Sequence, residues 1–190
     1  MKKIISVAMI SILIAVKILA QGNFSTLNGR VSFFASAPVA DVDAVNEKTK
    51  VELNTSTHEI SVSIAMADFQ FKSNKMGRDA EKKYLETKKY PNASFQGKLN
   101  GNINYQKPGT YPVTASGKLS IHGVEKQVNE KGTVTVSKEQ ITLQSEFNVS
   151  LKDYNIETPK ILGQEMTSES VQVKIKASLK EKAKKPLQKG

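Results

Sequence analysis

Ser120 and His122 are the residues of this chain whose types and spacing come closest to a catalytic arrangement. On an extended strand, residues two apart face the same side, so the pair has the arrangement of a nucleophile and its general base. The spacing identifies no third member and no oxyanion hole. A histidine directly before a glycine, here Gly123, is typical of a strand end whose ring bonds the turn backbone. We therefore expect a structural role for His122 and no catalytic residues.

Metal and cofactor chemistry have still less support in the sequence. The only histidines are His58 and His122, which are far apart, and the chain has no cysteine. Such a set is too thin for a metal site by spacing. A glycine-rich phosphate loop and a metalloprotease helix motif are also missing. We expect no metal, no cofactor and no enzymatic activity.

The elements that would position any site are β-strands. Between Tyr111 and Ile121 every second residue is apolar or very small, which is the pattern of a strand with one face in an apolar interior. The same period marks further strands near residues 50–54, 59–67, 92–105, 124–136, 141–151 and 169–180. Short sequential connections favour antiparallel hairpins. The sequence thus predicts an all-β fold, a sandwich or a barrel, and an antiparallel meander of roughly eight strands that closes into a barrel is the economical topology.

One short helix and several connections are predicted between these strands. Met76, Ala80 and Tyr84 recur at helical spacing within residues 74–87, and Asn74 is placed to cap this helix. We expect the first strand at residues 30–35 and a polar connection at 41–50. Phe69 and Phe71 should extend the strand that precedes them.

Two further local expectations concern the second half of the chain. Pro108 and Gly109 have the composition of a hairpin turn, with a positive φ at the glycine. The strand at 124–136 should be broken over residues 130–132.

The N-terminus has the features of a secretory signal peptide. Lys2 and Lys3 precede an apolar run from Ile4 to Val16, and Ala20 is a small residue before polar Gln21. The run is too short to span a membrane comfortably, although a retained anchor is the alternative. We expect a signal peptide at residues 1–20, one barrel domain at 21–180, and an exported protein, periplasmic or extracellular.

The net charge of +10 is concentrated at the two ends. Three lysines lie in the predicted signal peptide, and a lysine-rich tail at residues 181–190 ends the chain. The body between them is only weakly basic, which argues against a nucleic-acid partner. The tail is either a solvated terminus or a site of peripheral contact with anionic lipid. The oligomeric state is left open.

Small residues at inward positions hint at an interior cavity. Ala93, Gly97, Gly101, Ala115, Gly117 and Ser145 stand where a packed core would place Leu, Ile or Val. Small residues leave room for a ligand, whereas glycine also marks the bends at which a sheet curls into a barrel. The sequence supports both explanations.

Two segments resemble a known family. The first runs from Tyr84 to Phe95 and contains Tyr90-Pro91; the second runs from Gly117 to Lys126 and contains Leu119-Ser120-Ile121-His122-Gly123-Val124. They are similar to the two most characteristic segments of the bacterial YceI-like proteins. Asp153 and Tyr154 fit the later Asp-aromatic step of that family, whereas Leu151 and Asn155 replace its usual Arg and Gly.

The resemblance implies an exported, lipocalin-like barrel that binds a long apolar molecule such as a polyisoprenoid, an isoprenoid quinone or a fatty-acid-type lipid. Tyr90, Pro91, His122 and Gly123 are then structural residues of the family motifs. Candidate lining residues lie on predicted inward faces or on the helix that could cap the barrel; they are Phe69, Phe71, Met76, Tyr84, Phe95, Leu119, Ile121, Phe147 and Tyr154. Ordinary core packing is the alternative for each of them.

Three functions follow from these observations. The first is a lipid-binding carrier, store or scavenger. The second is a structural or stress-associated envelope protein whose barrel is filled by its own side chains. The third, a hydrolase that uses Ser120 and His122, has the least support.

Overall fold

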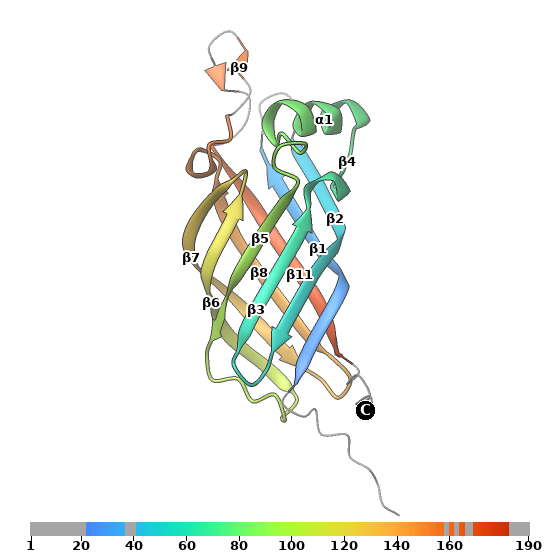
Figure 1. Ribbon diagram of the computed structural model, residues 1–190, viewed down its shortest axis with the longest axis vertical. Coiled ribbons are helices and arrows are strands. Elements are labelled where there is room, and N and C mark those ends of the chain that lie inside the picture. Colours follow the sequence, from blue (N-terminus) through green and yellow to red (C-terminus); the bar gives the residue numbers. More distant parts are fainter. Residues whose placement is uncertain (1–21, 37–40, 158–159, 162–163, 166–168, 183–190) are drawn as a thin grey trace, which may run out of the picture.

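A computed structural model describes residues 22–36, 41–157, 160–161, 164–165 and 169–182. The predicted signal peptide and residues 183–190 of the tail lie outside the described residues. The long strands are β1 (Asn23–Ala35), β2 (Val42–Asn54), β3 (Glu59–Ala65), β5 (Asn92–Asn100), β6 (Gly109–Ile121), β7 (Val124–Val136), β8 (Ile141–Ser150) and β11 (Ser170–Glu181). They form the elongated barrel of Figure 1.

The strands close into a single antiparallel barrel, which confirms the predicted fold class. Their order is β1-β11-β8-β7-β6-β5-β3-β2-β4, and pairing of β1 with β2 joins the ends of the sheet. β4 (Gln70–Phe71) is a two-residue strand beside β2, and β9 (Lys160–Ile161) pairs only with β10 (Gln164–Glu165). Neighbouring strands mostly follow one another in sequence, because short hairpins connect them.

The predicted N-terminal boundaries are wrong. β1 begins at Asn23 rather than at residue 30, and the stretch expected to be a polar connection at 41–50 forms most of β2. The inward column of β2 includes buried Asn46 and Thr49. The two residues lie on either side of a register shift against β1. A polar inward column and an interrupted period of two together hide this strand from pattern analysis.

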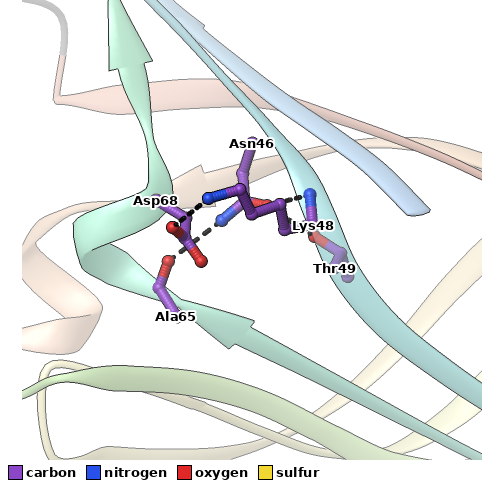
Figure 2. A network of polar contacts seen from close by, with 5 residues as sticks. All are labelled: Asn46, Lys48, Thr49, Ala65 and Asp68. Atoms are coloured by element: carbon purple, nitrogen blue, oxygen red, sulfur yellow. Dashed lines mark hydrogen bonds and ion pairs between the residues drawn. The ribbon is translucent and has the colours of Figure 1, made fainter. Parts of the chain in front are cut away.

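Asn46 holds this irregularity in place (Figure 2). Its side-chain oxygen accepts hydrogen bonds from the Lys48 backbone N–H at 2.8 Å and from the Thr49 hydroxyl at 3.3 Å. Its amide nitrogen donates to the Ala65 carbonyl at 2.9 Å, at the end of β3. Here β2 changes partners, from β3 at residues 50–53 to β4 at 44–45. The amide thus satisfies backbone groups that regular pairing would otherwise use.

A helical segment covers one end of the barrel (Figure 1). The short 3-10 helix η1 (Met66–Asp68) leads through Phe69 to β4, so Phe69 and Phe71 do not extend β3. The helix α1 (Asn74–Asp79) continues as a π-helical turn, η2 (Ala80–Tyr84), and therefore ends before residue 87. Its N-cap is Ser73, whose side chain accepts from the Met76 N–H, rather than Asn74.

The strands and hairpins from β5 to β7 correct three further expectations. Gly109 opens β6 and has no positive φ, because the turn of that loop lies earlier, where the Lys107 N–H donates to the Asn104 carbonyl at 3.2 Å. β5 correspondingly ends at Asn100 rather than near residue 105. β7 runs unbroken through residues 130–132. The tight turn at His122 and Gly123 is present, with φ of 51° and 74°.

The interior is packed differently along the barrel. At the end away from the helix, a continuous cluster of buried residues fills the lumen; it includes Phe24, Leu53, Ile141 and Leu179. Toward the helix, two smaller clusters line the walls. One is centred on Val31, Met66 and Phe69, and the other on Val149, Tyr154 and Ile156. Many apolar residues around these two clusters are only half-buried. The barrel is therefore more tightly packed at one end than at the other.

Candidate functional site

The candidate site is a cavity inside the barrel. Its volume is about 200 Å³, and side chains from all eight long strands line it, joined by Met66, Phe69, Leu85, Leu151 and Ile156. Nearly all of these side chains are apolar. For scale, an engineered apolar cavity of roughly 150 Å³ holds benzene, whereas ordinary ligand pockets measure roughly 300–1,000 Å³. The space suits a slender apolar group.

The predicted lining residues fall into two sets. Phe69, Phe95, Leu119, Ile121 and Phe147 line the cavity. Phe71, Met76, Tyr84 and Tyr154 lie outside the lining. Phe71 lies under α1, where it contacts Gly77, and Tyr154 is buried in the cluster with Val149 and Ile156. Contact of any of these residues with a ligand stays a prediction.

Sequence reasoning missed four contributors outside the strands, which are Met66, Leu85, Leu151 and Ile156. Leu85 follows the π-helical turn and reaches the cavity, whereas the helical face expected to do so carries Met76 and Tyr84. Widening the last helical turn shifts the face that points inward, and no sequence signal marks that change. Ile156 lies just after the 3-10 helix η3 (Lys152–Tyr154), beyond left-handed Asn155.

The small inward residues serve both of the purposes that the sequence left open. Ala93, Ala115 and Ser145 line the cavity and leave room in it. Gly97 and Gly117 pair directly across β5 and β6. A Cβ atom on Gly97 would lie 2.3 Å from the Ser116 carbonyl oxygen, and one on Gly117 would lie 2.2 Å from that of Gln96. This glycine pair permits a close approach of backbones at a bend.

Tyr105 closes the filled end of the barrel. It is 7% exposed, packs into the core cluster there and contacts the ring of His58 edge-on, with centroids 5.6 Å apart. Burial raises the pKa of its hydroxyl to about 12. That hydroxyl is buried without a hydrogen-bond partner in the described structure.

His122 links three segments at the helix end of the barrel. Its Nδ1 lies 3.2 Å from the Tyr154 carbonyl oxygen and its Nε2 lies 3.0 Å from the Glu86 carboxylate. The ring also packs on Tyr90, with centroids 4.1 Å apart. Both ring nitrogens therefore face groups other than Ser120. The histidine joins the β6–β7 turn to other segments, instead of bonding the turn backbone as expected.

The described residues contain no group of three or more metal-ligating side chains close enough to hold an ion. They also contain no helix that is long and apolar enough to cross a membrane. What the geometry offers chemically is a water-poor, largely apolar interior. Such an interior suits noncovalent binding of an apolar molecule.

Solved structures with the same fold come from several bacteria. A domain from Saccharophagus degradans, described as polyisoprenoid-binding and implicated in plant cell wall breakdown, has a TM-score of 0.71 at 14% identity and covers 85% of this chain and 99% of its own. BcnA from Burkholderia cenocepacia has a TM-score of 0.64 at 19% identity, with 80% and 95% covered. A YceI protein from Campylobacter jejuni has a TM-score of 0.53 at 16% identity, with 83% and 86% covered.

The sequence comparisons give the family. Comparison with curated protein sequences found no match. The profile of the YceI-like domain matches residues 10–179, which is most of the chain and includes both segments on which the resemblance rests. The chain therefore belongs to the YceI-like domain family.

Proposed function

We propose that this protein is an exported binding protein that holds a long apolar molecule in its barrel, for carriage, storage or protection of the cell envelope. The observation that carries the proposal is the largely apolar cavity, lined from every long strand of a closed barrel. The fold shared with the polyisoprenoid-binding domain of Saccharophagus degradans supports a ligand of the same class. The candidates are a polyisoprenoid, an isoprenoid quinone and a fatty-acid-type lipid.

The energetics allow such binding without guaranteeing it. Burying a chain of about 16 carbons contributes roughly 13 kcal/mol, at about 0.8 kcal/mol for each methylene. Association and ordering cost about 4–15 kcal/mol. A preformed cavity lowers the cost, because its walls need no rearrangement. At about 200 Å³ the cavity is small for a long chain, so part of the ligand must widen it or leave through an opening.

Export rests on the N-terminal sequence. Lys2, Lys3 and the apolar run that ends at Val16 have the order of a signal peptide, with cleavage expected after Ala20. A binding protein that acts in the envelope would need this step. The intact mass of the exported protein tests it, and a product that starts at Gln21 is expected.

A filled barrel without a ligand is the second candidate function. The continuous core at the end away from the helix favours it, because Leu53, Val134 and Ile141 there are almost completely buried. A protein of this kind would serve as a structural or stress-associated component of the envelope. Such a protein, isolated from its host, would carry no extra mass from a bound ligand.

Native mass spectrometry of the protein purified from its own bacterium without detergent separates the two functions. We expect a fraction of the protein to carry an extra mass that organic solvent removes. The control is the same protein after unfolding and refolding without lipid. This control should be detected at the mass of the sequence alone. Only the sequence mass in every preparation, with no uptake of an added prenyl lipid, would contradict the proposal.

A further inference from the structure

The hydrogen-bonded ladder between β7 and β8 is incomplete. Their pairing runs from Val136 with Ile141 to Gly132 with Ser145 and stops there. Beyond that point β7 continues to residue 124 paired only with β6, and β8 continues to residue 150 paired only with β11. The Ser145 hydroxyl donates to the Lys131 carbonyl at 2.7 Å, at the point where the two strands part. We call this unpaired stretch, between residues 124–131 and 146–150, the seam.

The burial of inward residues shows that the cavity is more open at the seam. Below it, Val134 and Leu143 are 0% and 7% exposed. Beside it, the inward residues Val128 and Phe147 are only half-buried. Thr133 and Gln144 also line the cavity, although alternation along their strands places them outward, between inward neighbours. These two residues are paired with each other next to the last pair of the ladder, so the cavity extends to the place where β7 and β8 part.

The polar part of the lining gathers at the seam. Glu130, Thr133, Gln144 and Ser145 all lie on β7 and β8, close to the last paired residues, whereas Ser94 is the polar lining residue elsewhere. Glu130 faces inward opposite Ala115 and is half-buried. Its carboxyl group makes no hydrogen bond or ion pair with another described residue. The carboxyl group is therefore free to form a hydrogen bond with a ligand head that reaches the seam.

Glu130 is also the sole ionisable group among the described lining residues, and no lysine, arginine or histidine lines the cavity with it. Burial raises the pKa of the Glu130 carboxyl, and its charge in turn helps to raise the pKa of Tyr154. The lining therefore has no cation to neutralise a phosphate or a carboxylate. Of the two lysines along the seam, Lys126 pairs with Asp153 at 3.0 Å, and Lys131 alternates outward from the lining next to Glu130. A hydroxyl group can donate to the ionised carboxylate or accept from the protonated acid, so it fits both states.

We propose that Glu130 and the seam form the head-group subsite of the apolar ligand, and that this subsite selects an uncharged head bearing a hydroxyl group over an anionic one. The tail occupies the apolar cavity and the head lies at the seam between β7 and β8. This inference rests on the proposed function, since it assigns the polar end of the same ligand.

The test compares three probes that share one tail: geranylgeraniol, geranylgeranyl phosphate and the matching hydrocarbon. Each competes with a fluorescent apolar probe for the folded, full mature protein. We expect the wild type to bind the alcohol at least about tenfold more tightly than the phosphate. Glu130→Gln should raise the affinity for the phosphate at least about tenfold, because the like charge is gone. Glu130→Leu should lower the affinity for the alcohol to that for the hydrocarbon.

Glu59→Gln is the matched control. Glu59 lies on β3, away from the seam and outside the lining, and is exposed, where it accepts a hydrogen bond from the Thr57 hydroxyl at 3.0 Å, so its loss should leave all three affinities unchanged. A wild type that binds the phosphate as tightly as the alcohol, or a preference that persists in Glu130→Gln, would overturn the subsite while the proposed function stands. Failure of all three probes to bind would overturn the proposed function and the subsite with it.

Discussion

Tyr105 lowers the stability of the folded state in a way that the other residues of the filled core do not. Its hydroxyl is buried without a hydrogen bond in the described structure, and burial alone raises its pKa to about 12. A buried donor without a partner costs about 1–3 kcal/mol. Such a group marks a place where the interior is not optimised for stability.

Tyr105→Phe should therefore leave the stability unchanged or raise it by about 1 kcal/mol, because only the unpaired hydroxyl is removed. Tyr111→Phe is the matched control. The Tyr111 hydroxyl donates to the Lys107 carbonyl at 2.8 Å, so its loss should cost about 0.5–1.5 kcal/mol. Urea unfolding of both variants measures the difference. A loss in Tyr105→Phe equal to that in Tyr111→Phe would mean that the hydroxyl has a partner in solution.

His122 should matter for stability through its contacts with Glu86 and the Tyr154 carbonyl. Its side chain is 8% exposed. His122→Ala should cost about 1–3 kcal/mol, because it removes both bonds and the packing on Tyr90. A double-mutant cycle with Glu86→Ala should give a coupling of at least about 0.5 kcal/mol. Additive losses, or an esterase activity that disappears with His122, would reverse the structural assignment.

The pH dependence of stability should report Glu130. Burial raises the pKa of this carboxyl above its usual 4.5, so the folded state binds its proton more tightly than the unfolded state. The corresponding stability is fully present below pH 4.5 and is lost as the pH rises through the raised value. The wild type should lose more stability than Glu130→Gln across that interval. Parallel stability curves for the two proteins would show that the carboxyl is fully solvated.

At the level of elements, the β6–β7 turn depends on a glycine that the β5–β6 connection does not need. Gly123 has a φ of 74°, and a Cβ atom there would lie 2.6 Å from the Tyr90 ring. Gly109 lacks a positive φ, and the nearest atom to a Cβ there, the Tyr111 hydroxyl oxygen, would be 3.4 Å away. Gly123 is therefore the glycine that its turn requires, whereas composition alone had assigned that role to Gly109.

Gly123→Ala should cost at least about 1–3 kcal/mol, the usual strain of a side chain in this backbone region, and the Tyr90 clash adds to it. Gly109→Ala should stay within about 0.5 kcal/mol of the wild type. Thermal melts of both variants measure the two losses of stability. Equal losses would mean that the turn at residues 122–123 relaxes without strain.

Strands with a clean period of two could be predicted from the sequence, and those with polar inward residues could not. β6, β8 and β11 lie close to their predicted positions because Val113, Leu143 and Ala177 alternate with polar neighbours. β2 was predicted only near residues 50–54, and its N-terminal part escaped prediction because Asn46 and Thr49 occupy the inward column there. Their burial depends on contacts with Ala65 and with each other, which tertiary folding creates.

For the whole molecule, the closed barrel could be predicted but the shape of its interior could not. Phe95, Leu119 and Phe147 were assigned to the lumen by alternation alone, and they line the cavity. The seam depends on where the pairing of β7 with β8 stops, and alternation says nothing about that. The inward position of Glu130 was hidden in the same way, because the predicted break at 130–132 removed it from the strand.

The central claim is that the cavity holds the apolar ligand, and Ala115→Phe tests it most directly. Ala115 lines the cavity from the middle of β6, so a phenyl ring there would occupy ligand space. Thr114→Phe, on the neighbouring residue of the same strand, outside the lining, is the control. The affinity for a fluorescent prenyl or acyl probe and the urea midpoint are measured on all three proteins.

We predict that Ala115→Phe lowers the affinity for the probe at least about tenfold, about 1.4 kcal/mol. The stability of this variant should stay close to that of the wild type, because the cavity accepts the ring. Thr114→Phe should bind as the wild type does. A packed lumen would instead make Ala115→Phe less stable by about 1–3 kcal/mol. That loss, together with a wild type that binds no probe, would contradict the account.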